Sequence, residues 1–395
     1  MKTEAILLRR ELHENPELSG AEYNTAARIK AFLNRYSPDR LYDKIGGEGI
    51  LAIYNIPVQA LSTPKLSFYS SIVAESLPAT KLLFRCEIDA LPIEERSDLP
   101  YRSKNKGVAH LCGHDGHMAM MCCFAAELWS LKHTKYELAT DSETVSVFLL
   151  FQPAEETGEG AARVAVEFKK MELKFDLSFA LHNRPGYNTG DIIITEGTYA
   201  YASTGIEINL LGHTAHAAEP ELAISPVNAI ARIISYSNEI NNAHDINNIH
   251  HKERLCTIVY IETGEKAYGT TPGFGTIGMT IRARDDVSLS NFKLEIELFV
   301  HELAAEYGLE VEIKYHDYFP ATVNSNLSNE ILHKAAISKG LKVIRTQEAL
   351  PASDDFAHLT IDTNASFVDV GSGRNHPALH EPDFDFPDEI IEMLF

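Results

Sequence analysis

The sequence predicts an α/β protein: a three-layer αβα domain built on a largely parallel sheet, with a ferredoxin-like α+β domain inserted into it. Three observations lead to this prediction. Several strand-length segments are apolar throughout, as is typical of strands buried on both faces of a parallel sheet. Residues 199–317 instead predict elements in the order β-α-β-β-α-β, the split βαβ pattern. A chain of 395 residues also usually forms more than one domain.

The first predicted elements are two helices and a strand. Asn15-Pro16 is expected to separate the helices, because proline ends a helix at the preceding residue. A glycine-rich turn at 46–49 then leads into the strand ILAIYNI, and residues 57–80, rich in Ser, Pro and Ala, predict a surface excursion. The apolar residues at helical spacing are Ile6, Leu7, Leu12, Ala26, Ile29, Phe32 and Leu33.

Four apolar strands are each followed by polar side chains. The open sheet of an α/β protein binds ligands beyond the carboxyl ends of its strands, so we expect these side chains to meet in one site. The strands and their polar ends are KLLFRCEID (81–89) with Glu87 and Asp89, TVSVFLLFQPAEE (144–156) with Glu155 and Glu156, FDLSFALH (175–182) with His182, and ASFVDVGSG (365–373), which leads to His376 and His380.

The inserted domain is expected to follow the split βαβ order. Its strands and helices are TGIEINLLG, the helix SPVNAIARIISYSNEI, RLCTIVYIE, GTIGMTIRAR, a helix over 287–307 and LEVEIKYHD. We therefore expect one discontinuous domain from residues 1–198 and 318–395, interrupted by a second domain over 199–317.

Composition argues against several classes of partner. The formal net charge is −21, from 56 acidic and 35 basic residues, which repels nucleic acid and anionic membrane surfaces. The N-terminus lacks the apolar core of a signal peptide, and apolar runs such as VSVFLLF are too short to span a bilayer. Five cysteines without framework spacing fit free thiols in a reducing compartment. We expect a cytoplasmic protein.

The segment HLCGHDGH is the strongest candidate for a metal site. It places His110, His114, His117, Cys112 and Asp115 within eight residues, and these are groups that a borderline transition metal prefers. The alternative is a histidine-rich helix N-terminus capped by the aspartate.

Two adjacent carboxylates follow a buried strand in QPAEE. Glu155 and Glu156 point apart on a turn, so one can bind a metal ion while the other accepts a proton from an activated water. The alternative is an ordinary acidic first turn of a helix.

Other candidates have more than one interpretation. His182 at a strand end is a ligand candidate, and His376 and His380 compete for one role in a loop. Asp89 could orient a ligand imidazole or cap a turn, and Glu87 is a weaker candidate for the same role. The Cys122-Cys123 pair in a helical run is interpreted as packing.

These motifs resemble the M20 metallopeptidase superfamily, specifically the amidohydrolase branch that contains hippurate, auxin-conjugate and N-acyl-amino-acid hydrolases. The similarity extends over nearly the whole chain, and several motifs in the same order make it specific. The motifs are RRELHENPELSGAE, CEIDALP, HLCGHDGH, FQPAEETGEGA, ALHNRP, GHTAHAAEP, ASDDFAHL and PALHEPDF, followed by DFPDE.

The resemblance implies a site and an assembly. Two divalent ions per subunit, zinc or manganese, would be bound in the discontinuous domain, with Glu155 as general base and acid and Asp89 beside them. The inserted domain would be a lid and dimerisation domain, whose His216 reaches the partner subunit's site and whose Arg282 grips a substrate carboxylate. The implied metal ligands are Cys112, His114, Glu156, His182 and His380.

Two positions depart from the family pattern. Glu87 stands where the family usually has Asp, and Gly269 stands where an asparagine commonly assists the arginine at 282. The implied activity is hydrolysis of the amide bond of N-acyl amino acids or similar small peptide-like substrates. The alternatives are a dipeptidase or aminopeptidase on the same scaffold, and a non-catalytic binding paralogue.

Overall fold

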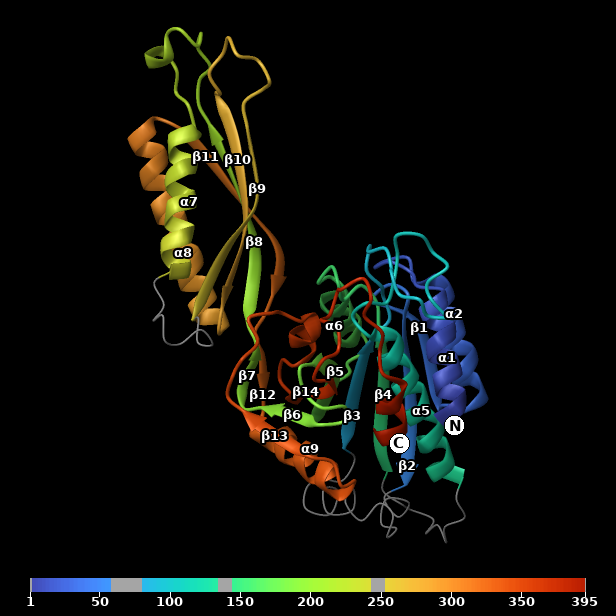
Figure 1. The fold of residues 1–395 in the computed structure, drawn as a ribbon. Helices are drawn as coiled ribbons and strands as arrows, with labels where there is room; N and C mark the ends of the chain where they lie inside the picture. The colour runs from blue at the N-terminus through green and yellow to red at the C-terminus, as the bar shows by residue number, and fades with distance from the viewer. Residues whose placement is uncertain (1, 58–79, 134–143, 243–252, 395) are drawn as a thin grey trace. The chain divides into compact units, whose positions relative to one another are not determined.

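The chain folds into two compact units in a computed structural model, which describes residues 2–57, 80–133, 144–242 and 253–394 (Figure 1). Unit 1 comprises Met1–Gly197, Val323–Gln347 and Asp355–Phe395, and unit 2 comprises Thr198–Thr322 and Glu348–Asp354. Two short strands lie where the chain passes between the units, β7 (Gly197–Ala200) and β12 (Thr322–Asn324). The excursion expected over 57–80 falls almost entirely outside the described residues.

Among its described residues, unit 1 contains a sheet of eight strands in the order β1-β2-β4-β3-β5-β14-β6-β13. The four central strands β4, β3, β5 and β14 are mutually parallel, whereas β1, β2 and β4 pair antiparallel, as do β14 and β6. The strands are β1 (Arg40–Ile45), β2 (Gly49–Pro57), β3 (Lys81–Glu87), β4 (Thr144–Gln152), β5 (Leu177–Pro185), β6 (Ile192–Thr195), β13 (Val343–Thr346) and β14 (Asn364–Gly373).

Helices cover both faces of this sheet. Val147 of β4 packs in one hydrophobic cluster with residues of α5, whereas the next residue, Phe148, contacts Phe175, which in turn contacts Phe168 of α6. Because successive residues of a strand point to opposite faces, α5 and α6 lie on opposite sides, and the predicted three-layer arrangement is confirmed. The helices are α1 (Lys2–Glu14), α2 (Tyr23–Arg35), α5 (His114–His133), α6 (Gly160–Lys170), α9 (Asn326–Ser338) and α10 (Asp388–Leu394), with a short 3-10 helix at Asp355–Leu359.

Unit 2 has the predicted ferredoxin-like topology. Its antiparallel sheet has the order β11-β8-β10-β9, and two helices pack on it through a core that includes Ile208, Ile277 and Phe292. Figure 1 shows both helices on one face of the sheet. In chain order the elements are β8 (Ala202–Leu211), α7 (Val227–Asn242), β9 (Arg254–Thr263), β10 (Phe274–Ala283), α8 (Asp286–Tyr307) and β11 (Glu310–Phe319), with a 3-10 turn at Pro220–Leu222.

Some details differ from the sequence-based expectation. Leu7 is 62% exposed, although its spacing matches the buried face of α1. The strands β6 and β13 have four residues each, too few for a periodic pattern to identify them. No helix in the described part of the chain is long and apolar enough to cross a membrane.

Candidate metal centre

His114 begins α5 and is held by Asp89, the second residue beyond β3. Its Nδ1–H donates to the backbone carbonyl of Asp89 at 2.9 Å, so Nε2 is the ring nitrogen that faces the neighbouring candidate ligands. The buried carboxylate of Asp89 accepts hydrogen bonds from Ser19 Oγ at 2.7 Å and from the backbone N–H of Glu156 at 3.0 Å. Asp89 therefore orients His114 through its main chain, and through its side chain it fixes the turn after β4.

Glu155 and Glu156 lie on that turn, directly beyond β4. An oxygen of each carboxylate lies 3.8 Å from Nε2 of His114. Close packing maintains the turn, because a Cβ at Gly160 would lie 1.7 Å from the carbonyl oxygen of Pro153. The two adjacent glutamates therefore both place a carboxylate near the same imidazole nitrogen.

Cys112 and His182 also lie close to His114, with ligand atoms within 4.8 Å of one another. Sγ of Cys112 is 3.3 Å from Nε2 of His182, and Nδ1–H of His182 donates to the backbone carbonyl of Asn183 at 2.8 Å. Both candidate ligand histidines, His114 and His182, thus use Nδ1 for a backbone carbonyl and present Nε2 to the cluster. This is the usual arrangement for metal-binding histidines, whose second nitrogen is held by a hydrogen bond.

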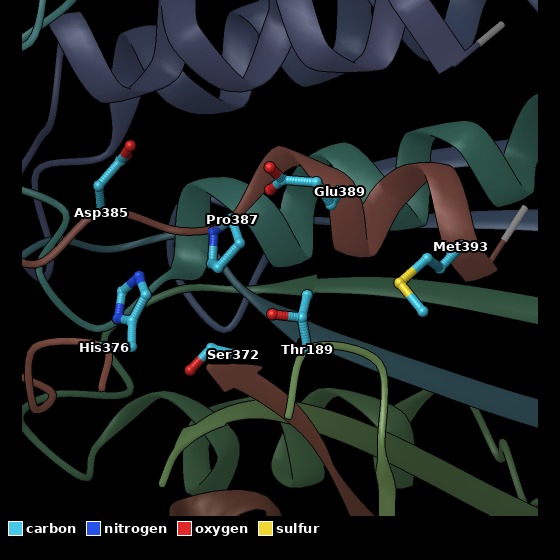
Figure 2. A pocket seen from close by; sticks show the side chains of 7 residues that line it. All are labelled: Thr189, Ser372, His376, Asp385, Pro387, Glu389 and Met393. Carbon is cyan, nitrogen blue, oxygen red and sulfur yellow. The ribbon is translucent and has the colours of Figure 1, made fainter. Parts of the chain in front are cut away.

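The two competing loop histidines have different environments. His380 adopts a positive φ of 68°, donates its backbone N–H to Leu111 at 2.8 Å, and places Nε2 3.8 Å from Glu156 Oε1. His376 instead packs on Phe384 and lines a surface pocket of about 580 Å³ beside α10. Figure 2 shows this pocket between the end of β14 and α10, from Glu389 in the first turn of the helix to Met393 in its last. Among the described residues, His376 belongs to no group of potential ligands.

The candidate ligands converge in overlapping groups. Within each group, the ligand atoms lie within 4.8 Å of one another. Three of these groups consist of Glu155 and the implied ligands: Cys112, His114 and His182; Cys112, Glu156 and His380; and His114, Glu155 and Glu156. All of these residues belong to unit 1.

Unsatisfied polar atoms show that the cluster fits a cation. Nε2 of His114, Oε1 of Glu156 and Oδ1 of Asp89 are buried without a hydrogen-bond partner in the described part of the chain. Such atoms cost free energy unless a partner compensates them. Imidazole, thiolate and carboxylate together suit a borderline divalent metal.

The pKa values in the protein without an ion lead to the same conclusion. Burial raises the pKa of the Cys112 thiol well above its ordinary value, and it raises the pKa of Glu156 to about 7 although the charge of His114 opposes it. Burial also lowers the pKa of His182 to about 3, so this imidazole is neutral. A bound cation would favour the ionised forms of Cys112 and Glu156.

An ion-pair network that the sequence analysis did not anticipate anchors the loop. Asp115 does not cap the helix; its Oδ2 lies 2.8 Å from both Arg9 Nε and His13 Nδ1, and all three side chains are buried. Nε2 of His13 lies 3.3 Å from Glu95, and Arg9 also pairs with Asp385. Arg9 and His13, which lie in the motif RRELHENPE, form a charged clamp on Asp115. Helical spacing alone does not reveal that Asp115 is their partner.

Glu87 belongs to a second buried network. It pairs with Arg85, and its Oε2 lies 2.7 Å from His117 Nδ1. Burial alone would raise the pKa of Glu87, but the charges of Arg85 and His117 hold it well below its ordinary value. This carboxylate therefore holds His117, and Asp89 is the residue that holds His114.

The two remaining candidates lie in unit 2. Nη1 of Arg282 in β10 donates to Ser353 Oγ at 2.7 Å, and Ser353 Oγ in turn contacts Ser203 Oγ and the carbonyl of Tyr201. His216 is exposed, and its Nδ1 accepts a hydrogen bond from the backbone N–H of Ala218 at 3.1 Å.

The chain is similar in sequence to known hydrolases. The profile of peptidase family M20/M25/M40 matches residues 83–394. An N-acetyl-L-cysteine deacetylase from Bacillus subtilis (strain 168) is 29% identical over 391 residues, which cover 99% of this chain and 85% of the relative. A protein named as an uncharacterized hydrolase from Staphylococcus epidermidis is 28% identical over 390 residues, covering 98% of this chain and 94% of the relative.

Solved structures show the same fold. The crystal structure of a dinuclear metal-binding M20 peptidase from Bacillus subtilis has a TM-score of 0.78 and 25% identity, covering all of this chain and 95% of the other. A putative aminohydrolase from methicillin-resistant Staphylococcus aureus has a TM-score of 0.81 at 24% identity, covering 99% and 93% of the two chains.

Proposed function

The chain belongs to peptidase family M20/M25/M40 and is a metal-dependent amidohydrolase, and from this premise we propose that it cleaves the amide bond of N-acyl amino acids or similar small peptide-like substrates. The observation that carries the proposal is the convergence of five candidate ligands and a neighbouring carboxylate, Glu155, beside the turns that follow β3 and β4. Open sheets bind their ligands beyond the carboxyl ends of their strands.

Two divalent ions, zinc or manganese, would be held by Cys112, His114, Glu156, His182 and His380. The donor set, the unsatisfied buried atoms and the relative described as dinuclear support this assignment. Divalent ions at such sites supply Lewis acidity, which polarises a carbonyl group and activates water at neutral pH.

Glu155 would act as the general base and acid. Its carboxylate would accept the proton of the attacking water and then deliver that proton to the nitrogen of the departing amine, so the proton is conserved over the reaction. Its position beside His114 Nε2 and its partly buried side chain support this role. Asp89 would keep the arrangement in place by holding His114 and the backbone of Glu156.

Arg282 would bind the substrate carboxylate without an asparagine at position 269. Ser353 Oγ donates its proton to the Tyr201 carbonyl and accepts from Arg282, so it fixes one nitrogen of the guanidinium. Burial lowers the pKa of Arg282, and among the described residues it forms no ion pair with a carboxylate. A partly desolvated, oriented guanidinium is suited to bidentate recognition of a carboxylate.

Unit 2 would serve as a lid and dimerisation domain. In a symmetric homodimer, His216 would reach the active site of the partner subunit and stabilise the negative charge that develops on the substrate oxygen. His216 is exposed and is distant in the sequence from the candidate ligands, which supports a role in the active site of another subunit. The enzyme would act in the cytoplasm on small molecules.

A substrate panel tests the proposed function. The protein is stripped with a chelator, reloaded with zinc or manganese, and assayed on N-acetyl and N-benzoyl amino acids, including N-acetyl-L-cysteine, and on dipeptides. We expect hydrolysis of at least one N-acyl amino acid, and only with metal. Cleavage confined to dipeptides would favour the peptidase alternative, and a protein that binds no metal and hydrolyses nothing would be a non-catalytic paralogue.

A further inference from the structure

Asn183 follows the candidate ligand His182 on β5 and is almost completely buried. Its backbone carbonyl accepts the Nδ1 proton of His182 at 2.8 Å. Its side-chain Oδ1 lies 2.7 Å from Nε2 of His117. Asn183 therefore makes two contacts. Its main chain binds the candidate ligand His182, and its side chain binds the helix that begins with His114.

The amide of Asn183 also packs against the segment that carries two other ligands. A Cβ at Gly113 would lie 2.1 Å from Asn183 Oδ1 and 2.9 Å from its Cγ. Gly113 stands between Cys112 and His114 and has a φ of +96°, which L side chains rarely adopt. The absence of a side chain at this position allows the amide to approach the backbone that orients both ligands.

A network of buried charged groups fixes the imidazole of His117, which contacts Asn183. His117 Nδ1 lies 2.7 Å from the carboxylate of Glu87, which pairs with the buried Arg85. Arg85 is fixed by Asp355 at 2.7 Å and by Gln152 at 2.8 Å. Because these groups satisfy one another on β3, β4 and the 3-10 helix that begins at Asp355, the imidazole of His117 has little freedom to turn.

We propose that Asn183 is a positioning residue of the metal centre, which sets the His182 imidazole and the Cys112–His114 backbone in one fixed relation. The amide bridges His117 and Gly113, and the carbonyl presents His182 Nε2 to the ion. This inference rests on the proposed metal site, and it adds a residue that touches neither metal nor substrate. Partners of this kind orient metal ligands, and their loss typically weakens metal binding about 10–100-fold.

The test is cobalt binding to the chelator-stripped full-length chain. Cobalt affinity is measured by competition with a chromophoric chelator, and the thiolate-to-cobalt absorption band reports the geometry at Cys112. We expect Asn183→Ala to weaken cobalt binding about 10–100-fold and to shift or broaden the band. Asn183→Ser, whose hydroxyl can bond to its own backbone, is measured in parallel in case the alanine variant does not fold.

Asn329→Ala is the matched control. This asparagine is similarly buried in unit 1, and it contacts Thr195 and Ser366 on β6 and β14 rather than the metal cluster. We expect this variant to lose thermal stability but to keep the wild-type affinity and band. A variant at 183 with affinity within about twofold of wild type and an unchanged band would overturn the proposal. Failure of the wild type itself to bind cobalt would instead contradict the metal site.

A double-mutant cycle tests the contact with Gly113 directly. Gly113→Ala should weaken cobalt binding, both through its backbone conformation and through collision with the asparagine amide. In the double variant with Asn183→Ala the collision is removed, so the two losses should be less than additive. Strict additivity would show that the amide does not set the Cys112–His114 backbone.

Discussion

Two histidine-bearing loops of this protein have similar composition but opposite environments. In unit 1, His114 and His117 are buried, and each is bonded to a fixed partner, the Asp89 carbonyl or the Glu87 carboxylate. In unit 2, His213 and His216 are exposed, and the hydrogen bond recorded for the His216 ring is to a neighbouring backbone N–H.

The difference shows how burial determines what a histidine can do. The loop of unit 1 is preorganised by its own chain, because Asp115 pairs with Arg9 and His13 and the Asp89 carbonyl accepts the Nδ1 proton of His114. Such a loop can bind an ion without rearrangement. In unit 2, Thr271 Oγ1 bonds the backbone of Ala215, but the described residues contain no buried ion pair at His216, so a catalytic role for its ring would depend on groups outside its own loop.

The largest expected effect concerns the buried site. Glu155→Gln removes the proposed proton acceptor and keeps the shape of the side chain, so kcat should fall about 10²–10⁴-fold while metal content is unchanged. Glu159→Gln is the control, because this exposed glutamate pairs with Arg163 at 3.5 Å. Near-normal kcat in Glu155→Gln, with metal retained, would remove this residue from the mechanism.

The exposed loop should give the next largest effect. His216→Ala should lower kcat about 10²–10³-fold, the cost of losing one donor to a developing oxyanion. Metal content and fold should be unaffected, because the ring lies outside the metal-binding unit.

Mixing two inactive variants distinguishes a role across subunits from a role within one. His216→Ala and Glu155→Gln subunits, allowed to exchange, should regain about a quarter of the wild-type activity, since half of the dimers contain one complete site. Confirmed subunit exchange without recovery would mean that His216 acts in its own subunit or has no catalytic role.

The two loop histidines offer a paired test of the ligand assignment. Cys112→Ser and His380→Ala should each lower metal affinity at least about tenfold, and they should lower the melting temperature at a fixed metal concentration. His376→Ala should leave metal binding unchanged, because this ring packs on Phe384 away from the cluster. The opposite pattern in metal analysis would exchange the roles of the two histidines.

The smallest effect is a pH dependence of stability. Burial by itself would lower the pKa of His13, but Asp115 and Glu95 raise it to about 9, above its ordinary 6.5. The stabilising contribution is therefore complete below about pH 6.5 and is lost as the pH rises towards 9. It amounts to about 1–3 kcal/mol.

Thermal unfolding of the chelated protein over this pH range measures the contribution. We expect His13→Gln to be less stable at neutral pH and to lose less stability on going to pH 9. His301→Gln, exposed on α8, should follow the wild-type profile. Parallel profiles for the wild type and His13→Gln would mean that the charged clamp does not contribute to stability.

Local patterns in the sequence were sufficient for the architecture and for some of the candidate residues. Uniformly apolar strands indicated a sheet covered on both faces, and the polar residues that follow them marked the ligand-binding edge, including Glu155, Glu156 and His182. Parallel strands share this edge whatever their exact register, so side chains far apart in the sequence could be expected to meet there. The choice of His380 over His376 came from the family resemblance, and the two histidines lie in different environments in the fold.

Only the tertiary structure decided what supports these residues. The pairing of Arg9 and His13 with Asp115, of Glu87 with His117, and of Asn183 with Gly113 joins positions remote in the chain. Periodicity shows which face of a helix or strand is buried. It carries no information about which polar group on another element will pair with a polar side chain on that face. Those partners are set by side-chain directions and by the packing distance between elements, which exist only once the sheet and helices have assembled.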